Sequence, residues 1–312
     1  MTVAFFPASR DLSHASSRIR ALSVGKWLSE SGDVPISWND PHADVAVVFK
    51  RPELVERMKL GRKRVIFDIS DDYTWSDEHR RAYRSADIIV AGTMVLAQRV
   101  RVHNDKIVHI PDCIDPVSSA KAKWRGPWQD NFRHILWFGC WGSKHHDTGG
   151  MRDILSIKDE LNSFDDLALT ICSNSRELFQ RVSGELSIPT AYEEWDRNTF
   201  GSLLRRHHAV IIPVVDTPYT RAKSHNRVTT AIAAGVPVIA SNMPAYLPFG
   251  VTTTDWREAL AGPWKTADAQ LLEPYAIDWI GEKWKDLLCR AEGRHAPGEG
   301  QREATPAAPI VV

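Results

Sequence analysis

Four polar side chains lie close together in the stretch KSHNR, at residues 223–227, in a pattern that suits an anion. Lys223 and Arg227 supply two cations, while Ser224 and Asn226 supply two small hydrogen-bonding groups. The sequence VTTAIAAG that follows predicts a helix, so these groups lie at its start. The first N–H groups of a helix lack partners within the helix and attract negative charge. We therefore predict a phosphate or diphosphate site here; the alternative is a capped helix with solvated basic residues.

The same stretch continues into AAGVPVIA, which predicts a turn and then a buried strand. Together, KSHNR and AAGVPVIA resemble the nucleotide-sugar-binding region of GT-B glycosyltransferases, in particular the bacterial group 1 or family 4-like proteins. The resemblance implies an α/β fold in which two Rossmann-like domains face each other across a cleft. It also implies a nucleotide-sugar donor held mainly by the second domain, and no metal or cofactor besides that co-substrate.

One part of the family pattern is missing from this sequence. Retaining members often carry a Glu-x7-Glu motif across the helix, and its second Glu binds the donor's ribose. Aligned on AAG, the two positions are Ala222 and Thr230, and neither is acidic. The Thr230 hydroxyl would make a neutral hydrogen bond, which is weaker than a charge-assisted one. A different donor, different ribose contacts and lost catalysis remain as explanations.

A second candidate site is the acidic turn FDISDDY, which directly follows a predicted buried strand. Ligands of open parallel sheets bind at the carboxyl ends of the strands, so these carboxylates would face the cleft. One of them would accept the proton of the acceptor hydroxyl or bind sugar hydroxyls. Alternatively, one caps the helix that follows. We name Asp68 and Asp71 as the candidate catalytic residues.

Two further loops would border the donor. The loop GCWGSKHHD follows the first predicted strand of the second half, where GT-B proteins often place a basic residue on the diphosphate; Lys144 loosely fits that role. Ser173 ends the strand LALTICS, and in that fold the loop after this strand borders the nucleoside base. The HHD triplet does not predict a metal site, because adjacent residues cannot easily all turn toward one ion.

The loop SHASSRIR, at residues 13–20, would lie on the acceptor side of the cleft by the same resemblance. His14, Ser17 and Arg18 are the candidates here for contact with the acceptor or with a donor phosphate. A helix N-cap followed by exposed arginines explains the same residues equally well.

Residues 50–64, KRPELVERMKLGRKR, carry seven Lys or Arg against two Glu. Such a surplus would attract an anionic acceptor, for example a lipid-linked sugar at a membrane surface, or nucleic acid. More often such a run is a solvated helix face. We keep peripheral membrane contact through the run from Lys50 to Arg64 as an open alternative, and expect no stable nucleic-acid binding.

Strand and helix patterns alternate in both halves of the chain, which predicts two parallel α/β units. We expect an N-terminal, acceptor-side Rossmann-like domain over residues 1–112, a linker over 113–131, and a nucleotide-sugar-binding Rossmann-like domain over 132–275. The resemblance implies a helix that returns to the first domain, here at 276–292. The composition of residues 293–312 predicts a disordered tail.

Composition narrows the class of protein. The 312 residues are 43% hydrophobic, which is enough for ample core, and 39 basic side chains balance 39 acidic ones. The four cysteines show no metal or disulfide spacing, and neither a signal peptide nor a membrane span is visible, so we expect a cytoplasmic protein.

These patterns together predict a glycosyltransferase that moves a sugar from a nucleotide-sugar to a hydroxyl acceptor. Three alternatives stay open. They are a nucleotide-sugar epimerase on the same fold, a non-catalytic binding protein that kept the fold, and a glycosyltransferase that acts on modified DNA.

Overall fold

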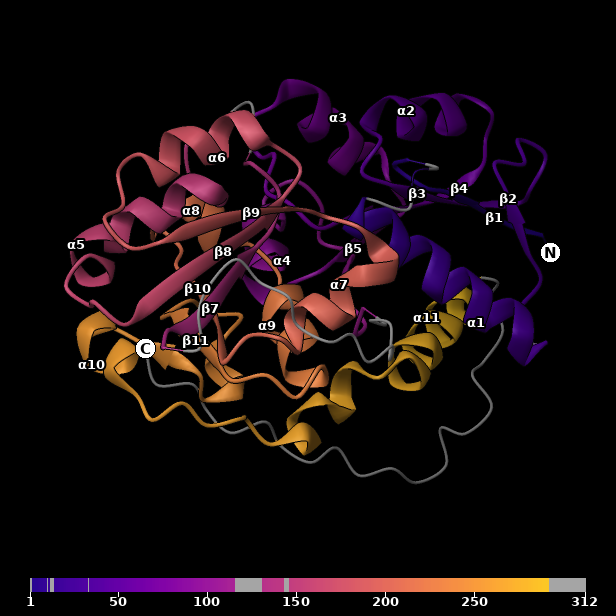
Figure 1. Ribbon diagram of the computed structural model, residues 1–312. Helices are drawn as coiled ribbons and strands as arrows, with labels where there is room; N and C mark the ends of the chain where they lie inside the picture. Colours follow the sequence, from indigo (N-terminus) through magenta and orange to yellow (C-terminus); the bar gives the residue numbers. More distant parts are fainter. Residues whose placement is uncertain are drawn as a thin grey trace.

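The first half of the chain forms a six-stranded sheet in which every pair of neighbouring strands is parallel (Figure 1). The computed structural model describes residues 2–9, 11, 14–32, 34–115, 131–142 and 146–291. The strand order is β2-β1-β3-β4-β5-β6. The strands are β1 (Val3–Phe6), β2 (Ile36–Trp38), β3 (Val45–Phe49), β4 (Arg64–Ile69), β5 (Ile88–Ala91) and β6 (Ile107–His109). We call this sheet and the helices packed on it the first domain.

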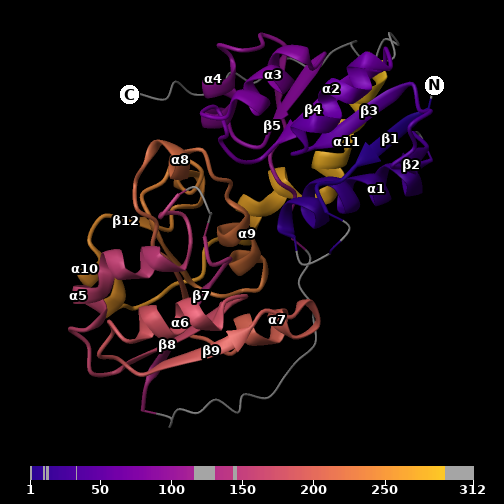
Figure 2. The same cartoon turned by 90° about the horizontal axis from the view of Figure 1, so that it is seen from above.

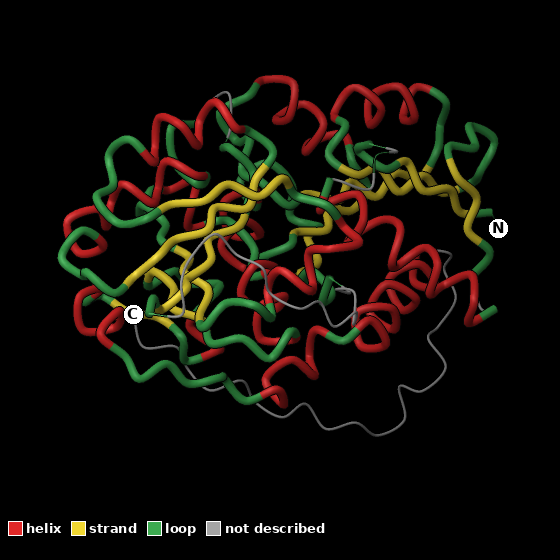
Figure 3. Tube along the Cα trace, viewed as in Figure 1, coloured by secondary structure: helices red, strands yellow, loops and turns green. Residues whose placement is uncertain are grey.

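Helices follow the strands of the first sheet and cover its two faces (Figure 3). Helices α3 and α4 are capped by side chains. The Ser76 hydroxyl accepts the backbone N–H of His79, and the Thr93 hydroxyl accepts the backbone N–H of Leu96. The helices are the π-helical η1 (Ser17–Leu22), α1 (Ser23–Ser31), α2 (Pro52–Leu60), α3 (Asp77–Ser85) and α4 (Met94–Val100).

The second half repeats this architecture in another parallel six-stranded sheet, with the order β12-β11-β10-β7-β8-β9. We call this unit the second domain. Its strands are β7 (Arg133–Phe138), β8 (Leu167–Ser173), β9 (Thr190–Glu194), β10 (Ala209–Ile212), β11 (Val238–Ser241) and β12 (Thr252–Thr253). Its helices are η2 (Met151–Ile157), α5 (Lys158–Leu161), α6 (Arg176–Ser183), α7 (Arg197–Leu204), α8 (Pro218–Arg221), α9 (Asn226–Ala233), η3 (Leu247–Phe249), α10 (Trp256–Ala261) and η4 (Ala269–Tyr275).

The last helix of the described residues, α11 (Ile277–Ala291), lies beside α1 on the first domain (Figure 2). Its buried stripe joins the core formed by one face of the first sheet, and the ring centroid of Trp284 lies 6.1 Å from those of Phe5 and Phe49. Aromatic rings at this separation attract each other in addition to burying apolar area. Helix α11 therefore completes a core that begins with β1, near the start of the chain.

The α/β class with two parallel sheets is confirmed. The chain changes sheets between β6 and β7, within the predicted linker, but residues 116–130 lie outside the described residues. The first residues of that predicted linker, Cys113 and Asp115, are buried. The predicted tail at 293–312 also lies outside the described residues, so the domain boundaries stay predictions.

Short elements differ from the sequence-based expectation. A single helix is expected from Met151 to Leu161, but the chain forms a 3-10 segment, η2, before the brief α5. The α-helix α8 and the two-residue strand β12 are not expected at all, because elements this short have no measurable periodicity. Among the described residues, none of the helices has the length and apolar character needed to cross a membrane.

Replacing Gly281 tests the packing of α11 on α1. A Cβ atom there would lie 2.3 Å from Cε3 of Trp27, so Gly281→Ala forces the indole to move. We expect the free energy of unfolding to fall by roughly 1–3 kcal/mol in urea titrations, because overpacking outweighs alanine's better helix propensity. The exposed neighbour Glu282 provides the control, since Glu282→Ala should change stability by no more than about 0.5 kcal/mol. Equal stability of the two variants would contradict the close packing.

Candidate functional site

The carboxyl ends of the two sheets meet at the loop that joins α8 to α9. Lys223, in that loop, places its Nζ 3.0 Å from Oδ1 of Asp71, which follows β4 of the first domain. The same ammonium group donates to the hydroxyl of Tyr219 at 2.9 Å. Lys50, which follows β3, forms an ion pair with the other oxygen of Asp71. One carboxylate therefore lies between two lysines that come from different domains.

Electrostatics fix the charge states of this cluster. Burial alone would raise the pKa of Asp71, but the charges of Lys223 and Lys50 outweigh it and hold that pKa well below its usual range. Burial would lower the pKa of Lys223, yet Asp71 and Tyr219 raise it. Two ammonium groups and one carboxylate leave a net positive charge, which suits an incoming anion. In this arrangement Asp71 binds a proton weakly and is a poor general base.

Two more bonds join the domains around the same loop. The hydroxyl of Thr93, at the start of α4, donates to the carbonyl oxygen of Ala222 at 3.0 Å, and Arg99 donates to the carbonyl oxygen of Pro218 at 3.3 Å. The side chain of Ala222 is buried in the core of the first domain. The residue aligned with the first missing glutamate therefore lies in the contact between the domains.

The start of α9 is the predicted anion site, and its geometry fits an anion. No side chain among the described residues caps this helix, so its first N–H groups remain available. The guanidinium of Arg227 lies 5.9 Å from the ring centroid of Trp137 and 3.5 Å from the Tyr246 hydroxyl. Ser224 and Asn226 are half-buried beside it.

A glycine of the second domain, Gly149, packs closely against Lys223. Gly149 has a φ of +82°, which favours glycine, and a Cβ there would lie 3.2 Å from Cε of Lys223. The Gly149 N–H donates to the carboxylate of the buried Asp153 at 2.8 Å. Burial raises the pKa of Asp153 to about 6, although that hydrogen bond and the charge of Arg227 oppose the rise.

Two predicted donor-side hydroxyls are already used inside the second domain. The Ser173 hydroxyl donates to the carbonyl oxygen of Gly139 at 2.8 Å, which ties the end of β8 to the loop after β7. The Thr230 hydroxyl is buried and donates to the carbonyl oxygen of Asn226 at 2.6 Å, within its own helix. Lys144 lies outside the described residues.

The predicted base Asp68 is not placed where an acceptor could reach it. Its side chain is fully buried, and its two oxygens accept from Nε and Nη2 of Arg20 at 2.7 and 2.6 Å. Arg20 also forms an ion pair with Asp112 at 2.7 Å. This network connects η1 to the ends of β4 and β6, so Asp68 serves the framework behind the site.

The three candidates for the acceptor side have different surroundings and do not form one site. His14 is exposed, with Nδ1 3.7 Å from the Asp11 carboxylate, and the buried Ser17 accepts the N–H of Ser9 at 2.9 Å. Arg18 is buried in an ion pair with Asp115, and its guanidinium lies 5.0 Å from the ring centroid of Trp195 in the second domain. Arg18 thus makes a further contact between the domains, away from the loop before α9.

Sequence reasoning missed Lys50, Tyr219 and Asp153 as members of the site. Lys50 had a usable signal, since it follows a buried strand as Asp71 does, but it was assigned to a basic surface run. Tyr219 and Asp153 depend on the path of two loops, which no local pattern indicates. Among the described residues, no group of three or more His, Cys, Asp or Glu side chains could hold a metal ion.

Similar solved structures share this fold. Neither a protein-family model nor a curated protein sequence matches the chain. A glycosyltransferase from Rickettsia africae is 12% identical with a TM-score of 0.67, and the match covers 93% of this chain and 98% of that one. HepE of Anabaena, in complex with UDP and glucose, is 11% identical with a TM-score of 0.66, covering 92% of this chain and 99% of that one. The lipopolysaccharide outer core galactosyltransferase WaaB is 11% identical with a TM-score of 0.64, covering 93% and 100%. The chain therefore has the two-domain GT-B fold.

Asp68→Asn tests the framework role of Asp68. Loss of this carboxylate leaves the buried Arg20 with Asp112 alone, so we expect the free energy of unfolding to fall by about 3–5 kcal/mol. Asp166 is the matched control, because it also pairs with an arginine, Arg133, through both oxygens but is half-exposed. Asp166→Asn should cost no more than about 1 kcal/mol. Urea titrations measure the free energy of unfolding of both variants, and an equal loss in the two would contradict the framework role of Asp68.

Asp153 gives a prediction for the pH dependence of stability. The pKa of Asp153 in the folded protein, about 6, exceeds the ordinary value of 3.8, so its protonation favours the folded state at low pH, and this contribution disappears as pH rises through 6. Asp153→Asn removes the titration. The stability of the variant relative to wild type should therefore increase by roughly 2–3 kcal/mol between pH 4 and pH 7. Urea titrations at several pH values measure this difference, and a pH-independent difference would show that Asp153 titrates normally.

Proposed function

We propose that the chain transfers a sugar from a nucleotide-sugar donor to a hydroxyl acceptor. The observation that carries the proposal is the convergence of Lys223, Arg227 and the uncapped start of α9 where the carboxyl ends of both sheets meet. Open α/β sheets bind ligands at this edge, and helix starts bind phosphate. The GT-B fold and the UDP present in similar structures, such as HepE, support a nucleotide-sugar as the anion.

Cations and the helix start would stabilise the leaving diphosphate. Negative charge builds on the diphosphate as the bond to the sugar breaks, and preorganised donors stabilise such charge without reorganising. Arg227 and the first N–H groups of α9 would bind one phosphate. Lys223 would leave Asp71 and bind the second phosphate, while Lys50 would remain paired with Asp71. The exchange therefore leaves no carboxylate without a partner.

This exchange would connect donor binding to the acceptor side. With Lys223 on the phosphate, one of the two charges that hold down the pKa of Asp71 is withdrawn. The pKa of Asp71 would then rise, and its carboxylate would become a better acceptor for a hydroxyl proton. Of the two predicted catalytic aspartates, we therefore assign the acceptor role to Asp71 and the framework role to Asp68.

The ribose and the sugar would be held differently from the Glu-x7-Glu pattern. An acidic side chain at position 222 would be buried against the core of the first domain, where a lone charge is costly. The Thr230 hydroxyl is already bonded within its helix. Specific contacts to the donor therefore come from other groups, for which the loop after β11, with Tyr246 near Arg227, is the nearest source.

A thermal-shift panel of nucleotide-sugars, including UDP-glucose, tests the donor site. We expect at least one to stabilise the wild type, and Lys223→Ala with Arg227→Ala to weaken its affinity by about tenfold or more, because two charge-assisted bonds are lost. The matched control is Arg221→Ala with Lys265→Ala, which removes one arginine and one lysine from exposed positions of the same domain.

The control protein should respond to the donor like the wild type. Equal stabilisation of all three proteins would contradict the phosphate assignment, and a panel in which no nucleotide-sugar stabilises the wild type would contradict the proposed function. Each protein is first melted without ligand, so that any loss of intrinsic stability is subtracted.

A further inference from the structure

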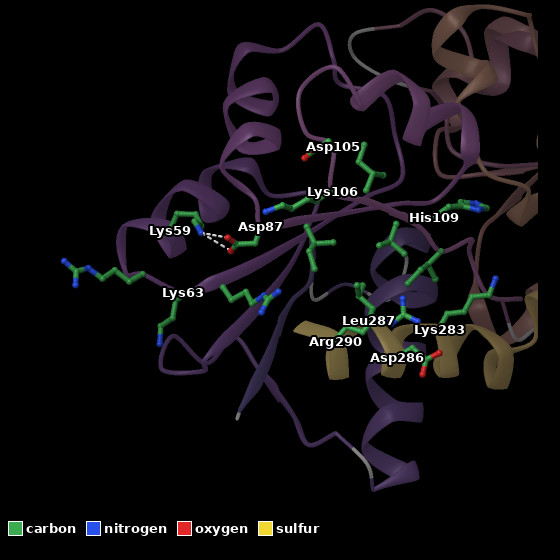
Figure 4. Close-up of a pocket in the computed structure, with 16 residues that line it drawn as sticks. Lys59, Lys63, Asp87, Asp105, Lys106, His109, Lys283, Asp286, Leu287 and Arg290 are labelled. Carbon is green, nitrogen blue, oxygen red and sulfur yellow. Dashed lines mark hydrogen bonds and ion pairs between the residues drawn. The ribbon is translucent and has the colours of Figure 1, made fainter. Parts of the chain in front are cut away.

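A hollow of about 910 Å³ lies on the first domain, away from the candidate donor site (Figure 4). It runs along the free edge of β6, beside α11, and reaches residues that precede the strands, including Asp87 before β5 and Lys106 before β6. The candidate donor site lies at the carboxyl ends of the same strands. The hollow also reaches His109 and Ile110, at the carboxyl end of β6, but it shares no lining residue with the candidate donor site.

The rim of the hollow is strongly cationic. Its lining holds seven Lys or Arg side chains against three Asp, Asp87, Asp105 and Asp286. Some of these cations already have partners: Lys59 pairs with Asp87 at 2.8 Å, and Arg64 donates to the carbonyl oxygen at the end of α11. The remaining surplus is what an anion would meet.

Four of the lining cations form neither an ion pair nor a side-chain hydrogen bond within the described part of the chain: Arg62, Lys106, Lys283 and Arg290. All four are exposed. Figure 4 shows Lys59 on α2 and Lys106 before β6 on one side of the hollow, and Lys283 and Arg290 along α11 on the other. They come from three separate segments of the chain, so the fold, and not one basic helix face, brings them together. Like charges that line one hollow repel, and an anion bound there would relieve that repulsion.

The floor of the hollow is apolar. Ile88, Val108 and Leu287 line it and belong to the core that α11 shares with the first sheet. His109 adds no charge at neutral pH, because burial and then the charge of Lys283 lower its pKa to about 4. A cationic rim over an apolar floor suits a ligand that has both a phosphate and an apolar part.

The structure divides the basic run of residues 50–64 between two places. Lys50 turns to Asp71 in the candidate donor site, whereas Lys59 and residues 62–64 line the hollow. Only the later part of the run is therefore available for the surface contact that the sequence suggested. The partners that complete this surface, Lys106, Lys283 and Arg290, are distant in sequence.

We propose that this hollow is a second binding site, which takes a phosphate-bearing anion and contacts its apolar part through Ile88, Val108 and Leu287. The phosphate belongs either to the headgroup of an anionic lipid or to a soluble phosphate compound. The proposal does not depend on the donor site, because the two sites share no residue.

Binding is measured in a parent protein that carries Lys223→Ala and Arg227→Ala, so that the candidate donor site does not contribute. The probes are inorganic pyrophosphate by titration calorimetry and vesicles of phosphatidylglycerol in phosphatidylcholine by co-sedimentation. Adding Lys106→Gln, Lys283→Gln and Arg290→Gln should weaken binding of at least one probe by about tenfold, the combined effect of three exposed charge contacts.

The matched control adds Lys26→Gln, Arg257→Gln and Lys265→Gln, which removes the same number of lysines and arginines from exposed positions outside the hollow. The control should bind like the parent. Loss confined to the vesicles identifies a lipid headgroup as the source, and loss of pyrophosphate binding identifies a soluble phosphate. Equal weakening in the hollow and control proteins, or no binding of either probe to the parent, overturns the proposal.

Discussion

Asp71 lies between Lys50 of its own domain and Lys223 of the other, and the arrangement of the two domains depends on that shared carboxylate. A half-buried ammonium group needs a partner, because water no longer solvates it fully. Lys50 and Lys223 would repel each other if Asp71 were absent. The two ion pairs of Asp71 therefore fix the loop before α9 against the ends of β3 and β4. The hydrogen bond from Thr93 to Ala222 also holds this loop in place.

The same constraint gives the candidate site its chemical character. Lys223 is at once a contact between the domains and a cation in the loop directly before α9, so under the proposed function an anion at that helix and the bond to Asp71 would compete for one ammonium group. Lys50 makes the competition reversible, because Asp71 keeps a partner in either state. Behind this cluster, the buried network of Arg20 with Asp68 and Asp112 holds the strand ends in place and is not available for chemistry.

The first domain carries both candidate sites. Its strands end in the cluster around Asp71, and their beginnings, with the free edge of β6, border the cationic hollow. Helix α11 connects these features, since it follows the second domain in sequence, packs its apolar stripe on the first sheet and contributes Lys283 and Arg290 to the hollow. Removing the chain's last helix would therefore affect the core and the hollow together.

The sequence by itself determined the two α/β units and led to the prediction of an anion site at residues 223–227, because hydrophobic runs, helix starts and strand ends are local signals. It also pointed to the aspartates at the end of β4, but not to which one matters. Asp68 lies within the strand and Asp71 two residues beyond it, and only packing decides that Asp68 pairs with Arg20 and Asp71 with Lys223. Only the tertiary structure decided that Lys50 pairs with Asp71 in the candidate site instead of forming part of a basic surface. It also decided that Ala222 is buried between the domains, and that cations from three segments line one hollow. These are contacts between residues distant in sequence, and no local pattern encodes them.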